Sequence, residues 1–250
     1  KQLRDLNDPN DLHILAANSG CSFLLLRPSH RASRPNLETP MEAGMSKNPI
    51  DHLHHRAAER SAAFIEDEGR SAMIFPRKQK MWPWLAKQIP AKGMMMECGV
   101  FTGRSINAMA KNFPERKLFG FDSFEGLSED WAGVDLGAGA FDLEGKLPKV
   151  EENVTLIKGW VDDTLPVFFK KNKGTIAYLH VDTDTYTPAR TILSLAKERF
   201  RKGTIVLFDE LIGYPFWEEG EYLALTQELP RDSYEYIAFS QMQAAIRILK

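Results

Sequence analysis

Four side chains that could do chemistry stand at alternate positions in one short stretch, HVDTDTY. They are His180, Asp182, Asp184 and Tyr186. The apolar run before them predicts a buried strand. Because successive side chains of a strand point to opposite faces, the four should leave the sheet on one side. Burying carboxylates costs free energy unless a partner or ligand compensates, so this stretch is a candidate site.

A second acidic stretch, LFDEL, follows another apolar run and contributes Asp209 and Glu210. Together with Asp182, they could hold a hard divalent cation such as Mg²⁺ through carboxylate oxygens, and the metal would acidify a substrate hydroxyl. Alternatively, Asp182 acts as a general base without a metal. A structural role is the third interpretation, in which Asp184 and Glu210 only cap helices or pair with basic neighbours.

The stretch ECGVFTGRS, residues 97–105, follows another predicted strand and leads into a helix. Gly99 and Gly103 let the backbone approach a ligand closely, and a helix start offers free N–H groups. The dinucleotide pattern GxGxxG is absent. The acidic residue at the strand end, Glu97, suits a ligand with a cationic amine rather than a pyrophosphate. An ordinary strand–helix turn is the alternative.

Two further stretches suggest a nucleoside. In FGFDSFEGL, Asp122 ends a predicted strand and could accept both hydroxyls of a ribose, or it could cap the next turn. In KGWVDDTLP, Trp160 could stack on adenine, although a core or lid role is commoner for tryptophan. Glu97 and Asp122 together favour an adenosine-containing cofactor with a cationic end. S-adenosylmethionine meets both demands, whereas NAD meets only the second.

The elements that position these residues alternate from residue 93 onward as strand, helix, strand. This alternation predicts an α/β fold with a parallel sheet and helices on both faces. The last two predicted strands, 234–239 and 244–249, are too closely linked for a crossover helix and should pair antiparallel. Ligands of such sheets bind beyond the carboxyl ends of the strands, where all the acidic candidates lie.

The chain divides into three predicted parts. Residues 1–49 are rich in proline and polar residues in their second half and read as an irregular N-terminal arm or upstream sequence. Residues 50–92 are predicted to form an N-terminal helical cap. Residues 93–250 form the predicted cofactor-binding domain.

Composition excludes several classes of function. The net charge is −2, which argues against a nucleic-acid surface or a basic membrane patch, and no apolar run reaches membrane-spanning length. The two cysteines, Cys21 and Cys98, form no metal-binding or disulfide pattern. We therefore expect a cytoplasmic protein with no nucleic-acid or membrane partner.

In these motifs the chain resembles the class I S-adenosylmethionine-dependent methyltransferases, specifically the macrocin O-methyltransferase-like (TylF) group. The motifs are ECGVFTGRS, FDSFEGL, KGWVDDTLP, HVDTDTY and KGTIVLFDE, in family order over roughly residues 50–250. The resemblance implies a Rossmann-like sheet of seven strands in the order 3-2-1-4-5-7-6, with strand 7 antiparallel.

The resemblance also implies roles for individual residues. Glu97 and the Gly99–Ser105 turn would hold the methionine part of the cofactor. Asp122, with Ser123 beside it, would hold the ribose. Asp182 matches the metal-binding aspartate that is also proposed as the base. Family members follow their fifth strand with two aspartates, whereas this chain has Asp209 and then the longer Glu210.

The expected function is therefore transfer of a methyl group from S-adenosylmethionine to a hydroxyl of a small molecule, of sugar or natural-product type. Mg²⁺ is the candidate second cofactor. Family members commonly associate through N-terminal elements, so a homo-oligomer is compatible with the resemblance. Two alternatives stay open. One is a nucleotide-sugar glycosyltransferase that uses the DTD motif at 182–184, and the other is a non-catalytic cofactor-binding module.

Overall fold

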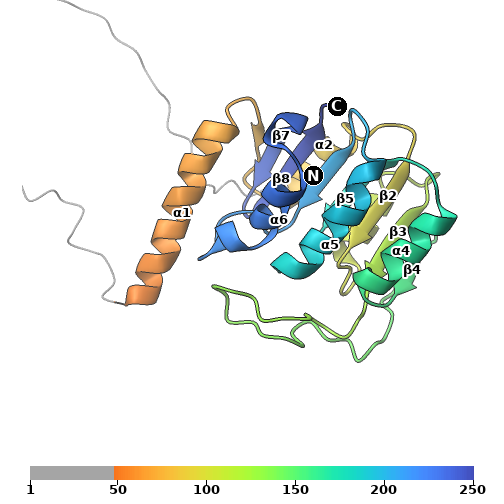
Figure 1. Ribbon diagram of the computed structural model, residues 1–250, viewed down its shortest axis with the longest axis horizontal. Coiled ribbons are helices and arrows are strands. Elements are labelled where there is room, and N and C mark those ends of the chain that lie inside the picture. The colour runs from red at the N-terminus through yellow and green to blue at the C-terminus, as the bar shows by residue number, and fades with distance from the viewer. Residues whose placement is uncertain (1–47) are drawn as a thin grey trace, which may run out of the picture. The chain divides into compact units, whose positions relative to one another are not determined.

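A single eight-stranded sheet forms the centre of the described structure, a computed structural model that describes residues 48–250 (Figure 1). The strands are β1 (Met73–Ile74), β2 (Met94–Cys98), β3 (Leu118–Asp122), β4 (Val154–Lys158), β5 (Ile176–Val181), β6 (Ile205–Phe208), β7 (Tyr234–Ser240) and β8 (Gln243–Ile248). The α-helices are α1 (Pro49–Glu68), α2 (Lys78–Ala86), α3 (Arg104–Ala110), α4 (Val161–Lys171), α5 (Tyr186–Ala196) and α6 (Glu221–Glu228). The predicted arm, apart from residues 48 and 49, lies outside the described residues.

The order of the strands is β1-β7-β8-β6-β5-β2-β3-β4. From β4 to β7 this is the predicted order 3-2-1-4-5-7-6, and β8 runs antiparallel to both β6 and β7. The α/β, Rossmann-like class is thereby confirmed. The predicted count of seven strands is wrong by one, because β1 adds a parallel edge strand to β7.

The extra strand comes from residues 50–92, the predicted N-terminal helical cap. Both residues of β1, Met73 and Ile74, have exposed side chains. A two-residue strand without a buried face has no alternation of apolar and polar residues, so the sequence pattern could not indicate it. The cap is thus partly built into the sheet.

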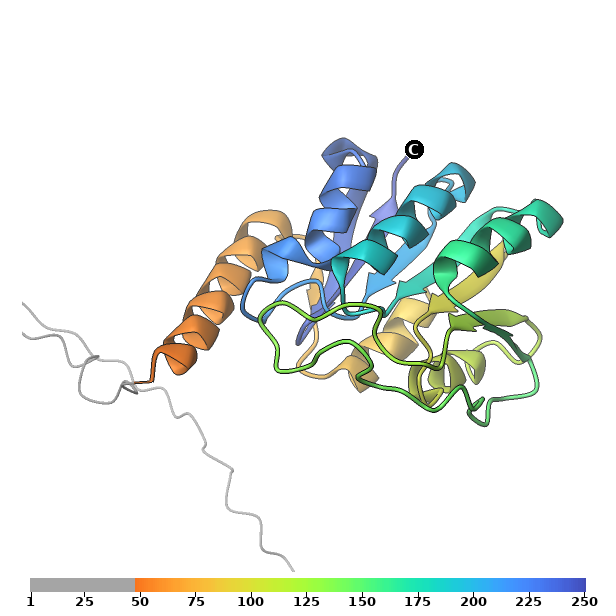
Figure 2. The ribbon, with the colours of Figure 1, turned by 60° about the horizontal axis from the view of Figure 1, so that its bottom comes forward.

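Helices cover both faces of the sheet, as Figures 1 and 2 show. On one face, α4, α5 and α6 share a core with side chains of β2, β5 and β6; on the other, α2 and α3 do so. The central strand β5 is buried along its whole length. In α4, acidic residues in the first turn and lysines in the last turn complement the helix dipole.

Helix α1 is the longest helix of residues 48–250, and it packs against the sheet domain through Ala57, Ser61 and Phe64. The Ser61 hydroxyl accepts a hydrogen bond from the Gly213 amide at 2.9 Å, which ties α1 to the loop after β6. Within residues 48–250, no helix is long and apolar enough to span a membrane.

The register of the sheet brings the candidate residues together. Glu97 of β2 is level with His180 of β5, and Val181 of β5 is level with Phe208 of β6. The residues that follow these strands therefore meet at one edge of the sheet. The long loop 126–153 contributes to the same edge and is visible in Figure 2 as the extended yellow-green segment.

Candidate active site

A cavity of about 360 Å³ lies at the carboxyl ends of the strands. Eight of the predicted site residues line it: Gly99, Ser105, Asp122, Ser123, Trp160, Asp182, Asp209 and Glu210. The other two lie behind the lining residues. Glu97 accepts a hydrogen bond from Ser105, and Gly103 is the N-cap residue of α3. The structure thus gathers residues from the ends of five strands, β2 to β6, around one space.

Gly99 allows the turn after β2 to lie directly against the end of β5. Its φ is +87°, and a Cβ atom there would lie 1.5 Å from the Asp182 carbonyl oxygen. The Asp182 amide in turn donates to the Cys98 carbonyl at 2.9 Å. Only glycine permits this approach, so the ECGVFTGRS and HVDTDTY motifs are physically joined here.

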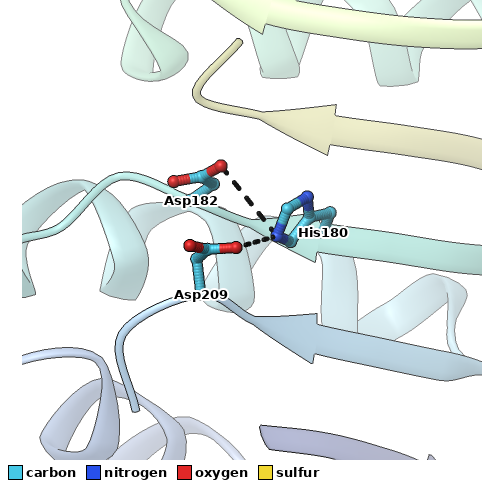
Figure 3. A group of neighbouring side chains, drawn as sticks. All are labelled: His180, Asp182 and Asp209. Carbon is cyan, nitrogen blue, oxygen red and sulfur yellow. Dashed lines mark hydrogen bonds and ion pairs between the residues drawn. The ribbon is translucent and has the colours of Figure 1, made fainter. Parts of the chain in front are cut away.

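A buried chain of hydrogen bonds runs between the two motifs through His180. The Ser105 hydroxyl donates to Glu97 Oε1 at 2.8 Å, and His180 Nδ1 lies 3.0 Å from Glu97 Oε2. His180 Nε2 lies 3.1 Å from Asp209 Oδ1 and 4.0 Å from Asp182 Oδ2 (Figure 3). Burial acts to lower the pKa of His180, but the hydrogen bonds to Asp209 and Glu97 override it and raise that pKa well above its usual value. The imidazolium then donates from both nitrogens.

Asp209 is surrounded by donors. Lys78 Nζ lies 3.1 Å from its Oδ2, while His180 and the Gln243 side-chain amide both donate to its Oδ1. Gln243 is oriented by the Trp82 indole N–H, which donates to its Oε1 at 3.2 Å. Burial acts to raise the pKa of Asp209, but the hydrogen bond from His180 holds it below its usual value.

Sequence reasoning missed both Lys78 and Gln243. Lys78 is the first residue of α2, far from the motifs in the chain. Gln243 gave a weaker signal, because it directly precedes the predicted strand 244–249; the structure makes it the first residue of β8 and leaves it only 1% exposed. A buried polar side chain needs a partner, so its position could have indicated a network.

The Asp122 carboxylate organises the cofactor side of the cavity. Its Oδ2 accepts from the Val100 and Phe101 amides at 2.7 and 2.8 Å, and its Oδ1 accepts from the Phe124 amide at 2.6 Å. A carboxylate has about four lone-pair sites, so capacity remains for a ribose hydroxyl. Asp122 therefore shapes the glycine turn and lines the cavity as well.

Aromatic side chains lie at the rim of the cavity. Trp160 precedes the first residue of α4 and is 38% exposed although it lines the cavity. Phe101 and Phe141, which also line it, meet edge to face with ring centroids 5.4 Å apart. An exposed tryptophan beside a cavity offers a stacking surface for a planar group.

Two overlapping groups of side chains could hold a cation. Oxygen atoms of Asp182, Asp184 and Glu210 lie within 4.8 Å of one another, and His180, Asp182 and Asp209 form the other group. The predicted metal ligands Asp182, Asp209 and Glu210 are thus all present at this edge, divided between the two groups. Glu210 is 6% exposed, and its Oε2 has no hydrogen-bond partner in the described structure.

Glu210 is buried and Asp182 and Asp184 are half-buried, so three carboxylates share a poorly solvated space. Burial raises the pKa of Asp182 and Glu210 well above the usual range, and it raises that of Asp184 to about 7. Behind Glu210 lies a fourth acid, Glu221, which is 0% exposed and accepts the Glu210 amide at 3.2 Å. Burial raises the pKa of Glu221 as well.

The alternation expected along HVDTDTY does not extend to Tyr186. Strand β5 ends at Val181, and Asp184 has a left-handed backbone with φ of +63°, so the alternation does not extend along the whole motif. Tyr186 begins α5, and its hydroxyl donates to Gln227 Oε1 of α6 at 2.6 Å. The phenol therefore supports the packing of two helices instead of joining the cluster.

Comparison with known proteins agrees with this architecture. Residues 96–211 match a family model described as a methyltransferase domain. Two crystal structures of CalS11, a calicheamicin methyltransferase, cover 86% and 84% of this chain and 99% of their own, with TM-scores of 0.58 and 0.53 and identities of 22% and 23%. The fold is that of the Rossmann-like methyltransferases.

The O-methyltransferase NovP is similar as well, with a TM-score of 0.51, 18% identity, and coverage of 81% of this chain and 98% of its own. A sequence search of curated proteins found no significant match. At these identities the structural similarity establishes the fold and not the reaction. The narrower assignment to the macrocin O-methyltransferase-like group remains a prediction.

Proposed function

We propose that this protein is an S-adenosylmethionine-dependent O-methyltransferase that acts on a hydroxyl of a small molecule. The observation that carries the proposal is the composition of one cavity wall. Ser105 in the first turn of α3, Asp122 at the end of β3 and Trp160 just after β4 line it together with Asp182. The candidate cofactor-binding residues and the candidate base, Asp182, thus line the same cavity.

The cofactor half offers a partner for each part of S-adenosylmethionine. The turn at Gly99 and Ser105, backed by Glu97, supports a role in binding the methionine part. Asp122, with Ser123 beside it, is suited to the ribose hydroxyls because its oxygens retain accepting capacity. Trp160 is suited to the adenine, since its exposed ring lines the cavity.

In the proposed reaction, the acceptor oxygen lies in line with the methyl–sulfur bond. Asp182 takes the proton of the hydroxyl, and an oxygen lone pair forms the new bond to the methyl carbon as the carbon–sulfur bond breaks. The products are a methyl ether, S-adenosylhomocysteine and a proton on Asp182. Burial raises the pKa of Asp182, which makes its carboxylate a stronger base than an exposed aspartate.

The acidic half also fits a hard cation such as Mg²⁺. Asp182 and Glu210 of the predicted metal set lie with Asp184 in a group of oxygen ligands, and Glu210 Oε2 lacks a partner. These three residues would hold the ion, which when bound would polarise the acceptor hydroxyl. Asp182 would then serve as ligand as well as base.

For the acceptor, we propose a hydroxyl of sugar or natural-product type. CalS11 is described as a TDP-rhamnose 3'-O-methyltransferase, which makes TDP-rhamnose the first compound to assay. The fold is shared and the identity is low, so a panel of sugar nucleotides and phenols should accompany it.

Isothermal calorimetry with S-adenosylmethionine tests the proposal. We expect binding by the full chain and its loss in Asp122→Ala. No heat and no thermal shift with the cofactor would refute the proposal. Binding of a UDP-sugar without S-adenosylmethionine would favour the glycosyltransferase instead. Cofactor binding with no methyl transfer to any panel member, with or without Mg²⁺, would favour the non-catalytic module.

A further inference from the structure

Lys78 places a fixed positive charge in the wall of the cavity. It is the first residue of α2, its side chain is 32% exposed, and its ammonium lies 3.1 Å from Asp209 Oδ2. The same ammonium lies 5.8 Å from the centre of the Trp82 ring. Lys78 is therefore held by both a carboxylate and an aromatic face.

The second oxygen of Asp209 is also in use. His180 Nε2 lies 3.1 Å from Oδ1, and the Gln243 amide donates to the same atom. Gln243 is in turn fixed by Trp82, which belongs to the same helix as Lys78. Three donors thus converge on one carboxylate that is 5% exposed.

Glu210 presents the opposite situation. It is 6% exposed, its Oε2 has no partner in the described structure, and its oxygens group with those of Asp182 and Asp184 within 4.8 Å. A divalent cation that also used Asp209 Oδ2 would have to displace the Lys78 ammonium or lie beside it. A divalent cation and the Lys78 ammonium next to each other would repel strongly, because little water screens the charges there.

We propose that Lys78 is a built-in cation that withdraws Asp209 from metal binding, so that a divalent ion at this site uses Asp182, Asp184 and Glu210. This inference deepens the metal part of the proposed function and rests on it. It departs from the predicted set at one ligand, Asp209, whose role becomes that of a positioning residue for Lys78 and His180.

Titration of the purified full chain with Mn²⁺, followed by electron paramagnetic resonance of the free ion, tests the inference without any acceptor. We expect Glu210→Gln to weaken Mn²⁺ binding by about 10- to 100-fold. Asp209→Asn should change it less than about twofold, because that carboxylate already has its partners. Lys78→Met should strengthen binding by at least about tenfold, since it frees an oxygen and removes a repelling charge.

Two further variants isolate the cause. Adding Asp209→Asn to Lys78→Met should remove most of the gain, because the released carboxylate supplies the additional ligand oxygen. Lys78→Arg keeps the charge and should behave like the native chain. Lys80→Met removes an exposed lysine of the same helix and serves as the matched control.

The outcomes separate cleanly. A native chain that binds no Mn²⁺ would overturn the inference even if Lys78→Met binds it, because Asp182, Asp184 and Glu210 would then not suffice to hold the ion. The inference is overturned if Asp209→Asn weakens native binding as much as Glu210→Gln, if Lys78→Met gains nothing, or if no variant binds Mn²⁺. Calorimetry with S-adenosylmethionine on the same samples reports separately on the proposed function.

Discussion

The two halves of the cavity treat their carboxylates in opposite ways. In the half formed by β2, β3 and β4, every acidic oxygen has a partner. Glu97 is shared between Ser105 and His180, and Asp122 accepts three backbone amides. No ligand is needed to complete these interactions, so this half is organised before anything binds.

The half formed by the ends of β5 and β6 is left incomplete. Glu210 Oε2 and Glu221 Oε1 lack partners in the described structure, and the Lys78 ammonium is paired with Asp209. Burial raises the pKa of Asp182, Asp184 and Glu210, so without a ligand these groups tend to hold protons.

The difference indicates a division of labour. A fully paired half can bind one constant ligand, the proposed cofactor, at little cost in reorganisation. An unpaired acidic half gains stability only when a cation or a proton-donating acceptor arrives. Substitutions should therefore have different consequences in the two halves.

The largest effect is expected for Asp182→Asn in the incomplete half. Loss of the proposed base should reduce methyl transfer by about 10²- to 10⁴-fold while cofactor affinity stays unchanged. In the native protein, the rate should rise with pH through the raised pKa of Asp182. Single-turnover assays with labelled S-adenosylmethionine would measure both. A residual rate within tenfold of the native rate would remove Asp182 from the role of base.

The next largest effect is expected for Glu97→Ala in the paired half. The substitution leaves a buried His180 and Ser105 without their acceptor, and breaking a buried ion pair costs about 3–5 kcal/mol of stability. Urea denaturation would measure the loss, with the exposed Glu115→Ala as a control. A loss as small as that of the control would mean that Glu97 is not an anchor of this half.

The paired half was largely predictable from the sequence. Its residues lie within short motifs at strand ends, where glycine spacing and an acid after an apolar run are local signals. The strand order was accessible through the family resemblance, whereas the alternation of strands and helices indicated only a parallel sheet covered on both faces. The edge strand β1 was not, since its two exposed residues carry no pattern.

The incomplete half was predictable only in its acidic residues. The partner of Asp209 is Lys78, 131 positions away in the chain, and no local signal connects the two. The left-handed backbone at Asp184, which ends the strand-like alternation and separates it from Tyr186, depends on packing as well. Which carboxylates are neutralised and which are free is thus a property of the tertiary structure.

A smaller effect, with a sign that depends on pH, is expected for Asp184→Asn. Burial raises the pKa of Asp184 to about 7, so the folded protein holds a proton that the unfolded chain releases near pH 4. Native stability therefore falls as pH rises from about 4 to 7, by up to about 4 kcal/mol for this group. The variant lacks this loss and should be more stable than the native protein at pH 8, and equal to it below pH 4.

Urea denaturation in the presence of a chelator would measure this difference at the two pH values. The exposed Asp67→Asn is the control and should show no such pH dependence. Added Mg²⁺ should reverse the advantage of Asp184→Asn, because the ion stabilises the native carboxylates. Equal stability of Asp184→Asn and the native protein at pH 8 would mean that the ionised Asp184 carboxylate does not destabilise the folded state.

The smallest effect is expected for Trp160→Ala, at the rim of the paired half. Stacking of an aromatic side chain on a base contributes about 1–3 kcal/mol, so the affinity for S-adenosylmethionine should fall by that amount in calorimetry. Trp160→Phe should recover most of it, and Mn²⁺ binding should not change, because the tryptophan belongs to the other half. A Trp160→Ala variant that loses Mn²⁺ affinity together with cofactor affinity would show that the two halves of the cavity are energetically coupled and would contradict the division of labour between them.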